Sequence, residues 1–304
     1  MQDSLRRTIP GAQVVGISFA SSTRNTWTVN FVLPADKNVA TAYVDPWRGR
    51  IVGRDEDTRT PLRWAHDLHT RLMTKGWGKT VVAWTSVALV FLSLTGLWLW
   101  WPGKIVRVRR GVSGRRMVFE LHNAIGGFTW IFMLIFGVTG MVVHWDKQAG
   151  DLLTALTGQP RAPTPPKPDS TCAGQPMASL DLLRANINAA APGAYATSIQ
   201  SGPKSTDPVM ARMKYPEDKT PAGRTLVIAQ RCTGKVLWVL DARKAPYAYR
   251  VVRVWNRSIH TGDVYGWPTR ILAALMALLL PVMTLTGPLI WWMRRTLRAQ
   301  GVAA

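Results

Sequence analysis

The run TVVAWTSVALVFLSLTGLWLWW, residues 80–101, decides the architecture of this chain, because it contains no Asp, Glu, Lys or Arg. As a helix with a rise of about 1.5 Å per residue, such a run crosses a hydrocarbon layer of about 30 Å. Two more uncharged runs of similar length follow, LHNAIGGFTWIFMLIFGVTGMVVHW at 121–145 and ILAALMALLLPVMTLTGPLIWWM at 271–293. Buried helices of soluble proteins are normally shorter and have one polar face. The sequence therefore predicts three transmembrane helices.

The composition excludes several other classes of protein. The chain has 304 residues, of which 47% are hydrophobic, so it is not a disordered protein, and its 2 cysteines exclude a disulfide-dense miniprotein. The net charge of +21 suggests a polyanionic partner. However, the basic residues cluster beside the apolar runs and not on a soluble face with stacking aromatics, so the lipid bilayer is the predicted partner and nucleic acid is not.

The basic segments also predict the orientation of the chain. Lysine and arginine are concentrated at 102–120 and in the tail at 294–304, and the positive-inside rule places both segments in the cytoplasm. Residues 1–75 and about 146–268 then lie outside. Tryptophans flank the runs at both ends, as expected for anchors at a membrane interface. We therefore expect a multi-pass membrane protein with large domains on the outer face.

Alternating apolar residues, glycine turns and one proline-rich stretch divide the rest of the chain. Strands are expected at about 13–20, 26–33 and 40–53, and a helix near 179–190. The predicted segments are an outer α+β domain at 1–60, a helix head and span at 61–101, a basic inner loop at 102–120, a span at 121–145, an outer linker at 146–178, a second outer α+β domain at 179–250, a helix head and span at 251–293, and an inner tail at 294–304.

An internal repeat relates the two halves of the chain. Pro-Gly-Ala occurs at 10–12 and again at 192–194, an offset of 182 residues. Further on, His69 precedes Thr95 by 26 residues, and His260 precedes Thr286 by the same spacing. The chain is thus interpreted as two copies of one unit, an outer α+β domain followed by a histidine-headed membrane helix, with the middle span as a shorter variant. The fold class predicted is an α-helical integral membrane protein with two small α+β domains.

All five histidines lie at or near a membrane boundary and none lies in the bulk of the outer domains: His66, His69, His122, His144 and His260. Histidine is rare and costly in membrane helices. Neutral imidazole is a strong axial ligand of haem iron, and two such ligands leave no open position, which suits electron transfer. An interfacial polar role is the competing interpretation for each histidine.

Spacing sorts these histidines into candidate pairs. His66 and His69 are three residues apart on one helical face, so they cannot be opposite ligands of one haem. His69 and His260 occupy equivalent places in the repeat and are the preferred pair for an outer haem. His144 is an alternative partner of His66, or a replacement for one member of that pair. His122 lies at the inner side and would ligate a second haem.

Other polar residues have structural interpretations. Cys172 and Cys232 both fall in the second outer domain, where a disulfide is favoured in an oxidising compartment over two buried thiols, and a metal site over two ligands is disfavoured. The Thr-Gly pairs at 95–96, 139–140 and 286–287 are interpreted as packing sites between helices. Asp67 and Asp263 either orient a neighbouring imidazole or cap a helix.

The order of an outer domain, Leu-His, Thr-Gly and Trp-Trp, with Pro-Gly-Ala and Asp-Pro-Trp-Arg-Gly in the domain, resembles the PepSY-associated transmembrane family of iron-regulated inner-membrane proteins. The resemblance implies periplasmic PepSY domains, four membrane helices, one or two haem b groups and reduction of ferric siderophores. This chain shows three runs, so we expect it to lack the family's first helix, through truncation or a misplaced start. The histidine of that helix would be the partner of His122.

The resemblance and the absence of nucleotide motifs together define the functional hypotheses. No P-loop, Gly-x-Ser-x-Gly elbow, His-Glu-x-x-His motif or GxGxxG fingerprint occurs. Electrons are therefore expected from quinol or a cytoplasmic reductase, with a ferric siderophore or other ferric chelate as acceptor. The alternative is a non-enzymatic PepSY membrane anchor that restrains a periplasmic peptidase or senses a ligand. A siderophore permease is disfavoured because no discontinuous helix pair is evident.

Overall fold

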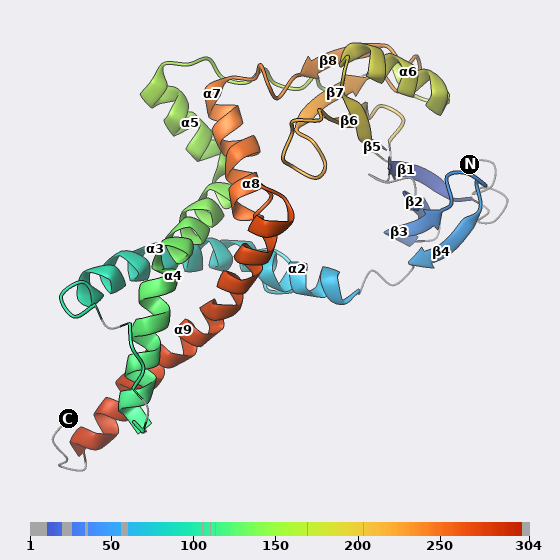
Figure 1. Ribbon diagram of the computed structural model, residues 1–304. Coiled ribbons are helices and arrows are strands. Elements are labelled where there is room, and N and C mark those ends of the chain that lie inside the picture. The colour runs from blue at the N-terminus through green and yellow to red at the C-terminus, as the bar shows by residue number, and fades with distance from the viewer. Residues whose placement is uncertain are drawn as a thin grey trace. The chain divides into compact units, whose positions relative to one another are not determined.

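The computed structural model describes residues 11–299, apart from 20–25, 34–35, 56–59 and the single residues 105, 110, 113, 169 and 203. Pro10 of the first Pro-Gly-Ala motif and Arg110 of the basic loop lie outside the described residues. The chain divides into two compact units (Figure 1). We call them the sheet unit, which comprises the residues up to Asp67 and Gly150–Val254, and the helix unit, which comprises Leu68–Ala149 and the residues from Trp255 onward.

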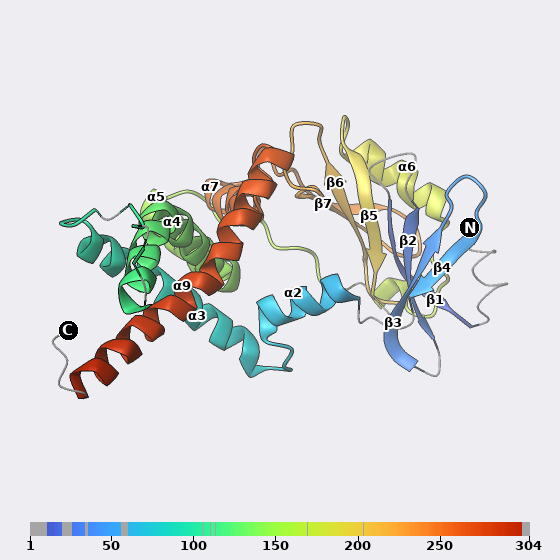
Figure 2. The same cartoon turned by 60° about the horizontal axis from the view of Figure 1, so that its bottom comes forward.

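The sheet unit contains one eight-stranded antiparallel sheet with the strand order β4-β3-β2-β1-β5-β6-β7-β8 (Figure 2). Buried and half-buried side chains alternate along β6, as expected where one sheet face covers a core. The strands are β1 (Gln13–Ser18), β2 (Trp27–Leu33), β3 (Asp36–Val44), β4 (Ile51–Asp55), β5 (Tyr195–Ser201), β6 (Val209–Lys214), β7 (Thr225–Ala229) and β8 (Val236–Leu240).

The two predicted outer domains share this sheet, because β1 pairs directly with β5. At the centre of that pairing Ile17 lies opposite Ile199, and the two residues are separated by 182 positions, the offset that also separates Gly11 from Gly193. Each half keeps its own hydrophobic core. One cluster of buried side chains contains Phe31, and the other is formed by side chains of β5, β6, β7 and the helix that follows residue 179.

A single helix, α6 (Leu180–Ala190), covers the second half of the sheet and contacts β5, β7 and β8. Ser179 caps its N-terminus by accepting a hydrogen bond from the backbone N–H of Leu182. Leu183 and Ile187 are four residues apart, so they lie on one helical face, and both are completely buried. The helix expected near 179–190 is present with nearly the same bounds.

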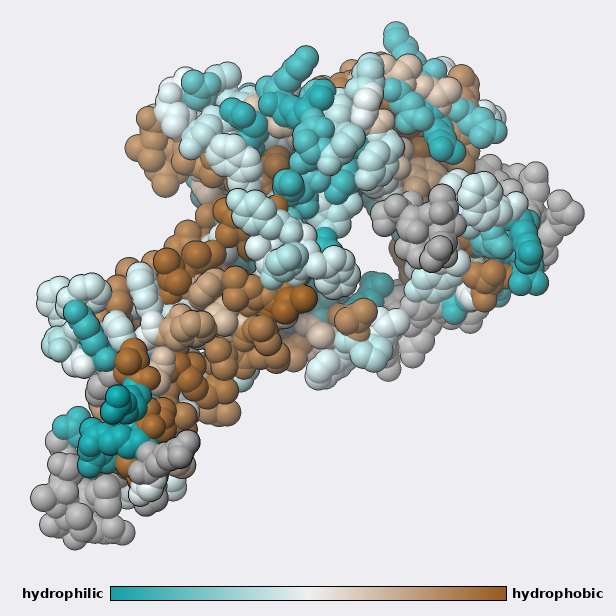
Figure 3. Space-filling model, viewed as in Figure 1, coloured by the Kyte–Doolittle hydropathy of each residue, from teal (hydrophilic) through white to brown (hydrophobic). Residues whose placement is uncertain are grey.

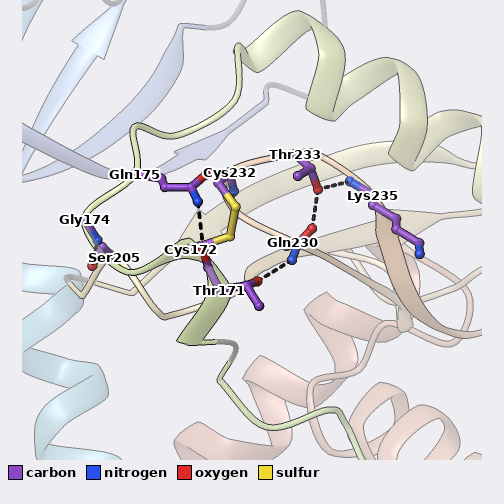
Figure 4. The surroundings of a disulfide bond; sticks show 9 residues. All are labelled: Thr171, Cys172, Gly174, Gln175, Ser205, Gln230, Cys232, Thr233 and Lys235. Carbon is purple, nitrogen blue, oxygen red and sulfur yellow. Dashed lines mark hydrogen bonds between the residues drawn. A yellow bond between two sulfur atoms is a disulfide. The ribbon is translucent and has the colours of Figure 1, made fainter.

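The sheet unit also contains a disulfide between Cys172 and Cys232 (Figure 4). Cys172 ends the short helix η1 (Ser170–Cys172), and Cys232 lies in the turn between β7 and β8. Around it, the backbone N–H of Cys232 donates to the Cys172 sulfur and the Gln230 amide donates to the Thr171 hydroxyl at 2.8 Å. The bridge therefore fastens the segment after the proline-rich linker to the β7–β8 hairpin.

The helix unit contains the three helices that, among the described residues, are long and apolar enough to cross a membrane. They are α3 (Trp77–Trp100), α4 (Gly114–His144) and α9 (Trp267–Ala299), in agreement with the three predicted spans. Hydrophobic side chains cover much of their surface (Figure 3). The remaining helices in the described part of the chain are α2 (Pro61–Arg71), α5 (Asp146–Thr157), α7 (Tyr247–Tyr249), the π-helix η2 (Arg250–Trp255) and α8 (Asn256–His260).

Within the helix unit, α4 is the central helix and contacts α3, α8 and α9. Glycine permits the close contact with α3: a Cβ added at Gly137 would lie 2.8 Å from Cγ2 of Val90 and 3.2 Å from the carbonyl oxygen of Ser86. Small residues at helix contacts are typical of membrane proteins, in which close backbone approach replaces the hydrophobic effect.

The first helical turns of α4 begin earlier than predicted. Residues 114–120 are helical, although the sequence predicted a loop as far as 120. Glu120 explains the difference, since its buried carboxylate accepts the backbone N–H of Arg109 at 2.9 Å and forms ion pairs with the guanidinium groups of Arg109 and Arg116. The carboxylate thus holds the basic loop against the start of the helix.

Candidate functional site

His260, the last residue of α8, makes a specific contact with the central helix. Its Nδ1 lies 2.8 Å from Oγ1 of Thr139 on α4. The Thr139 hydroxyl already donates its only proton to the carbonyl oxygen of Ile135, at 2.6 Å. The hydroxyl can therefore only accept from the imidazole, and Nδ1 of His260 must carry the proton. In the neutral ring Nε2 then bears the free lone pair.

A second side chain of α8, that of Asn256, also bonds Thr139 of α4. Asn256 lies one turn before His260 and is buried, and its amide donates to the carbonyl oxygen of Thr139 at 3.2 Å. Asn256 and His260 are four residues apart and share a helical face. Thr139 is therefore held at both its hydroxyl and its carbonyl oxygen. We call this group of four residues, His260, Thr139, Asn256 and His69, the His260 site.

The turn that follows His260 is fixed by Asp263. This buried carboxylate accepts a 2.6 Å hydrogen bond from Nε of Arg270 and another from the Thr261 hydroxyl, and its backbone N–H donates to the carbonyl oxygen of Ser258. The Asp263 carboxylate accepts from two side chains and, among the described residues, from no imidazole, and the two interpretations left open for it stay predictions. The aspartate joins the end of α8 to the start of α9 and so fixes the position of His260.

His69, near the end of α2, is the nearest second imidazole. The ring centroids of His69 and His260 are 6.1 Å apart, and the ring planes make an angle of 31°. Burial, followed by the neighbouring charges of His69 and Arg257, lowers the pKa of His260 to about 4. His260 is therefore neutral at pH 7 and offers a lone pair for bonding.

His122 makes the same kind of contact near the other end of α4. Its Nδ1 lies 2.7 Å from Oγ1 of Thr286 on α9. The Thr286 hydroxyl donates to the carbonyl oxygen of Val282 at 2.7 Å, so Nδ1 of His122 carries the proton and Nε2 is the free nitrogen. We call this pair, together with the adjacent Gly287, the His122 site.

Glycine gives both imidazoles room beside the helix that they contact. A Cβ added at Gly140 would lie 3.7 Å from Cε1 of His260, and one at Gly287 would lie 3.6 Å from Cε1 of His122. Each Thr-Gly pair therefore presents a hydroxyl acceptor and a flat surface to one ring. Because 17 residues separate His122 from Thr139 along α4, the two sites are about 25 Å apart along the helix axis.

The other candidate residues lie elsewhere. His66 is exposed and lies 3.4 Å from the Asp67 carboxylate. His144 is exposed and its ring contacts that of Trp145 edge to face at 4.9 Å between centroids. The third Thr-Gly pair, on α3, differs from the other two, because the Thr95 hydroxyl donates to the carbonyl oxygen of Phe91 but bonds no imidazole of the described residues. The expected partner of His122, a histidine of a preceding helix, stays a prediction.

Sequence reasoning missed the roles of Thr139, Thr286 and Asn256. The Thr-Gly pairs were interpreted as packing sites, and the glycines do pack closely, but two of the threonines bond histidines. The 26-residue spacing singled out Thr95 and Thr286, of which only Thr286 bonds a histidine, and Thr139 follows His122 by 17 residues, so spacing alone did not identify the pair. Asn256 has no signal in the sequence, because its partner is a backbone carbonyl 117 residues away.

The fold and the two sites define an integral membrane protein in which imidazoles at both ends of a helix bundle are fixed by threonines and offer a free nitrogen. Comparison with known families gives this class a name. The family description of the PepSY-associated TM region matches residues 3–294, and the chain belongs to this family. No protein of curated function matches the chain.

Proposed function

We propose that this protein is a haem b electron-transfer protein of the bacterial inner membrane that reduces ferric siderophores or other ferric chelates on the periplasmic side during iron uptake. The observation that carries the proposal is the tautomer of His260 and His122. In both residues Nδ1 donates to a threonine, so Nε2 is the free nitrogen, as axial haem ligation requires.

The spacing of the two imidazoles at the His260 site supports ligation of one iron by both. The ring centroids are 6.1 Å apart, so His69 and His260 would be close enough to hold one haem iron together. His69 and His260 also have equivalent places in the proposed repeat. The direct pairing of Ile17 with Ile199, at the 182-residue offset, supports that pseudosymmetry.

When bound, haem supplies a one-electron carrier. The residues of this chain determine where the haem is held and which oxidation state of its iron is favoured. His69 and His260 would hold an outer haem, and His122 would hold one ligand position of a second. Two histidine ligands leave no open coordination position, which favours electron transfer over oxygen chemistry. The sequence also named His66 and His144 as ligand candidates, and the proposal assigns a haem to neither of them.

The overall reaction balances with a quinol donor. One quinol gives up two electrons and two protons, becomes quinone, and reduces two ferric chelates to their ferrous forms. A cytoplasmic reductase is the other proposed donor. The basic loop at 102–120 and the basic tail support a cytoplasmic location for that side of the membrane, which leaves the sheet unit in the periplasm.

The haem content of the purified full-length chain tests this proposal. We expect haem b in the wild-type protein, loss of the outer haem in His260→Ala and in His69→Ala, and loss of the second haem in His122→Ala. His144→Ala, which removes an exposed boundary histidine, is the control and is expected to keep the wild-type content. A reduced wild-type protein should also be reoxidised by a ferric chelate. A chain without haem, or variants that all retain it, would contradict the proposal.

One observation favours the alternative of a PepSY anchor. β4 and β8 terminate the sheet, and a strand at the end of a sheet can pair with an extended peptide. An anchor of this kind would restrain a periplasmic peptidase or sense a ligand without a cofactor. The haem measurement separates the two functions, since an anchor has no need for histidines with a fixed tautomer.

A further inference from the structure

We propose that Thr139 and Thr286 are positioning residues that set the reduction potential of the haems. Each does so by accepting a hydrogen bond from Nδ1–H of the histidine that ligates the iron through Nε2. This inference rests on the proposed function. It goes beyond that function by assigning electronic control of each haem to a threonine on a neighbouring helix.

The first step of the argument is the direction of the two hydrogen bonds. A threonine hydroxyl has one proton, and in both residues the carbonyl oxygen four positions earlier takes it: Ile135 for Thr139, and Val282 for Thr286. The remaining lone pairs of Oγ1 face the imidazole at 2.8 Å and 2.7 Å, respectively. Each histidine is therefore the donor, and reversal of the hydrogen bond would cost the bond to the helix backbone.

The second step is the rigidity of the acceptor. At the His260 site Thr139 is buried, branching at its β-carbon restricts the side-chain rotamer, and Asn256 holds its carbonyl oxygen at 3.2 Å. A buried hydrogen bond is stronger than an exposed one, because water does not compete for either partner. The position of the Thr139 hydroxyl is thus fixed by contacts other than its hydrogen bond to the His260 ring.

The third step is the effect on the metal. An imidazole whose second nitrogen donates a hydrogen bond is a more basic ligand. A more basic ligand stabilises ferric iron relative to ferrous iron, so each threonine is expected to lower the potential of its haem. Removal of the acceptor should raise the potential, since the imidazole then gives less electron density to the iron.

Isosteric substitution tests this inference. Thr139→Val and Thr286→Val keep the side-chain volume but remove the acceptor, whereas Thr139→Ser and Thr286→Ser keep it. Two matched controls are available. Thr129→Val removes a buried hydroxyl of α4 that donates to the carbonyl oxygen of Ile125. Thr284→Val removes a hydroxyl of α9 that donates to the carbonyl oxygen of Leu280.

Redox titration of each purified full-length variant, followed by the visible spectrum, gives the potential at equal haem content. We expect each valine variant to favour reduction of its haem by up to about tenfold, which corresponds to an upward shift of up to about 59 mV. We also expect about tenfold weaker haem retention. The serine variants should restore both values, and the two control variants should match the wild type. A valine variant that loses haem while the serine variant and control keep it supports the inference as well.

Two different results would contradict the inference that Thr139 and Thr286 set the reduction potential. Valine variants with wild-type potential and haem retention, or serine or control variants that behave like the valine variants, overturn the role of the threonines and leave the proposed function intact. A wild-type chain without haem is a separate result, seen before any variants are compared, and it overturns the proposed function together with this inference.

Discussion

The sheet unit and the helix unit differ in the share of polar side chains that they bury. In the sheet unit the largest fully buried residues are apolar, such as Phe31, Leu183 and Val227. In the helix unit the buried set includes Thr129, Glu120 and other polar residues, while hydrophobic side chains cover its outside (Figure 3). The difference follows from the surroundings, since water favours burial of apolar area, whereas lipid is as apolar as leucine.

The comparison also indicates where function lies. Burial of a polar group costs free energy unless it is hydrogen-bonded. In the helix unit the buried polar residues include Thr139, Asn256 and Asp263, which fix His260 directly or through the adjacent turn. Buried polar residues are therefore the best guide to the candidate site in this unit, whereas in the sheet unit most buried side chains are apolar.

The largest effect on stability is expected in the core of the sheet unit. Leu183→Ala removes a side chain that is 0% exposed, so we expect the free energy of unfolding of this unit to fall by about 2–5 kcal/mol. Denaturant unfolding followed by near-UV circular dichroism measures it. Leu182→Ala, at a neighbouring position that is 45% exposed, is the control and should change stability little. Equal effects of the two variants would show that the core has been wrongly located.

Removal of the disulfide is expected to have the next largest effect on stability. The double variant Cys172→Ser and Cys232→Ser releases a loop of 60 residues, and we expect the sheet unit to lose about 2–4 kcal/mol of stability. Thermal unfolding with and without a reductant measures this effect. The reductant should lower the midpoint of the wild type to that of the variant and leave the variant unchanged. An unchanged wild-type midpoint would contradict a stabilising role.

A smaller effect is expected at the contact between α3 and α4. Gly137→Ala places a methyl group 2.8 Å from Cγ2 of Val90 and should destabilise the helix unit by about 1–3 kcal/mol. Gly96→Ala is the matched control, because a Cβ at Gly96 meets nothing within 4 Å. Thermal stability in detergent should separate the two variants, and a result in which Gly96→Ala is the more harmful would refute the proposed packing.

The smallest effect is expected on the lipid-facing surface. Leu278 is 70% exposed on α9, so Leu278→Ala should change stability by no more than about 0.5 kcal/mol. The same chemical change at Leu183 is expected to cost several times more, which makes the pair a direct test of the comparison. Thermal unfolding of both variants in one detergent measures it. A large loss at Leu278 would indicate that a further protein surface covers this face of α9.

The fold was predictable where composition determines it. Long runs without charge predicted α3, α4 and α9, and a helix near 179–190 followed from the apolar spacing that buries Leu183 and Ile187. The pairing of β1 with β5 was not predictable, since it joins strands more than 180 residues apart through backbone hydrogen bonds that any sequence can form. The early start of α4 depends on Glu120, whose partner Arg109 lies in the irregular loop before the helix.

The candidate site was predictable only in part. Boundary position and repeat spacing singled out His69, His122 and His260, which are the histidines that the structure places beside another imidazole or a threonine. The partners Thr139 and Thr286 are on other helices, 121 and 164 residues from their histidines, and the local sequence does not encode such contacts. The repeat gave only a partial clue, since the threonine that follows a histidine along the sequence is not the threonine that the histidine contacts.

The most direct test of the central claim is the dithionite-reduced minus oxidised visible spectrum of the purified protein, recorded for the wild type, His260→Ala and His144→Ala. We predict the α band of a b-type haem in the wild type and in His144→Ala, and a diminished band in His260→Ala. A wild-type spectrum without a haem band, or equal bands in all three proteins, would contradict the assignment of His260 as a haem ligand.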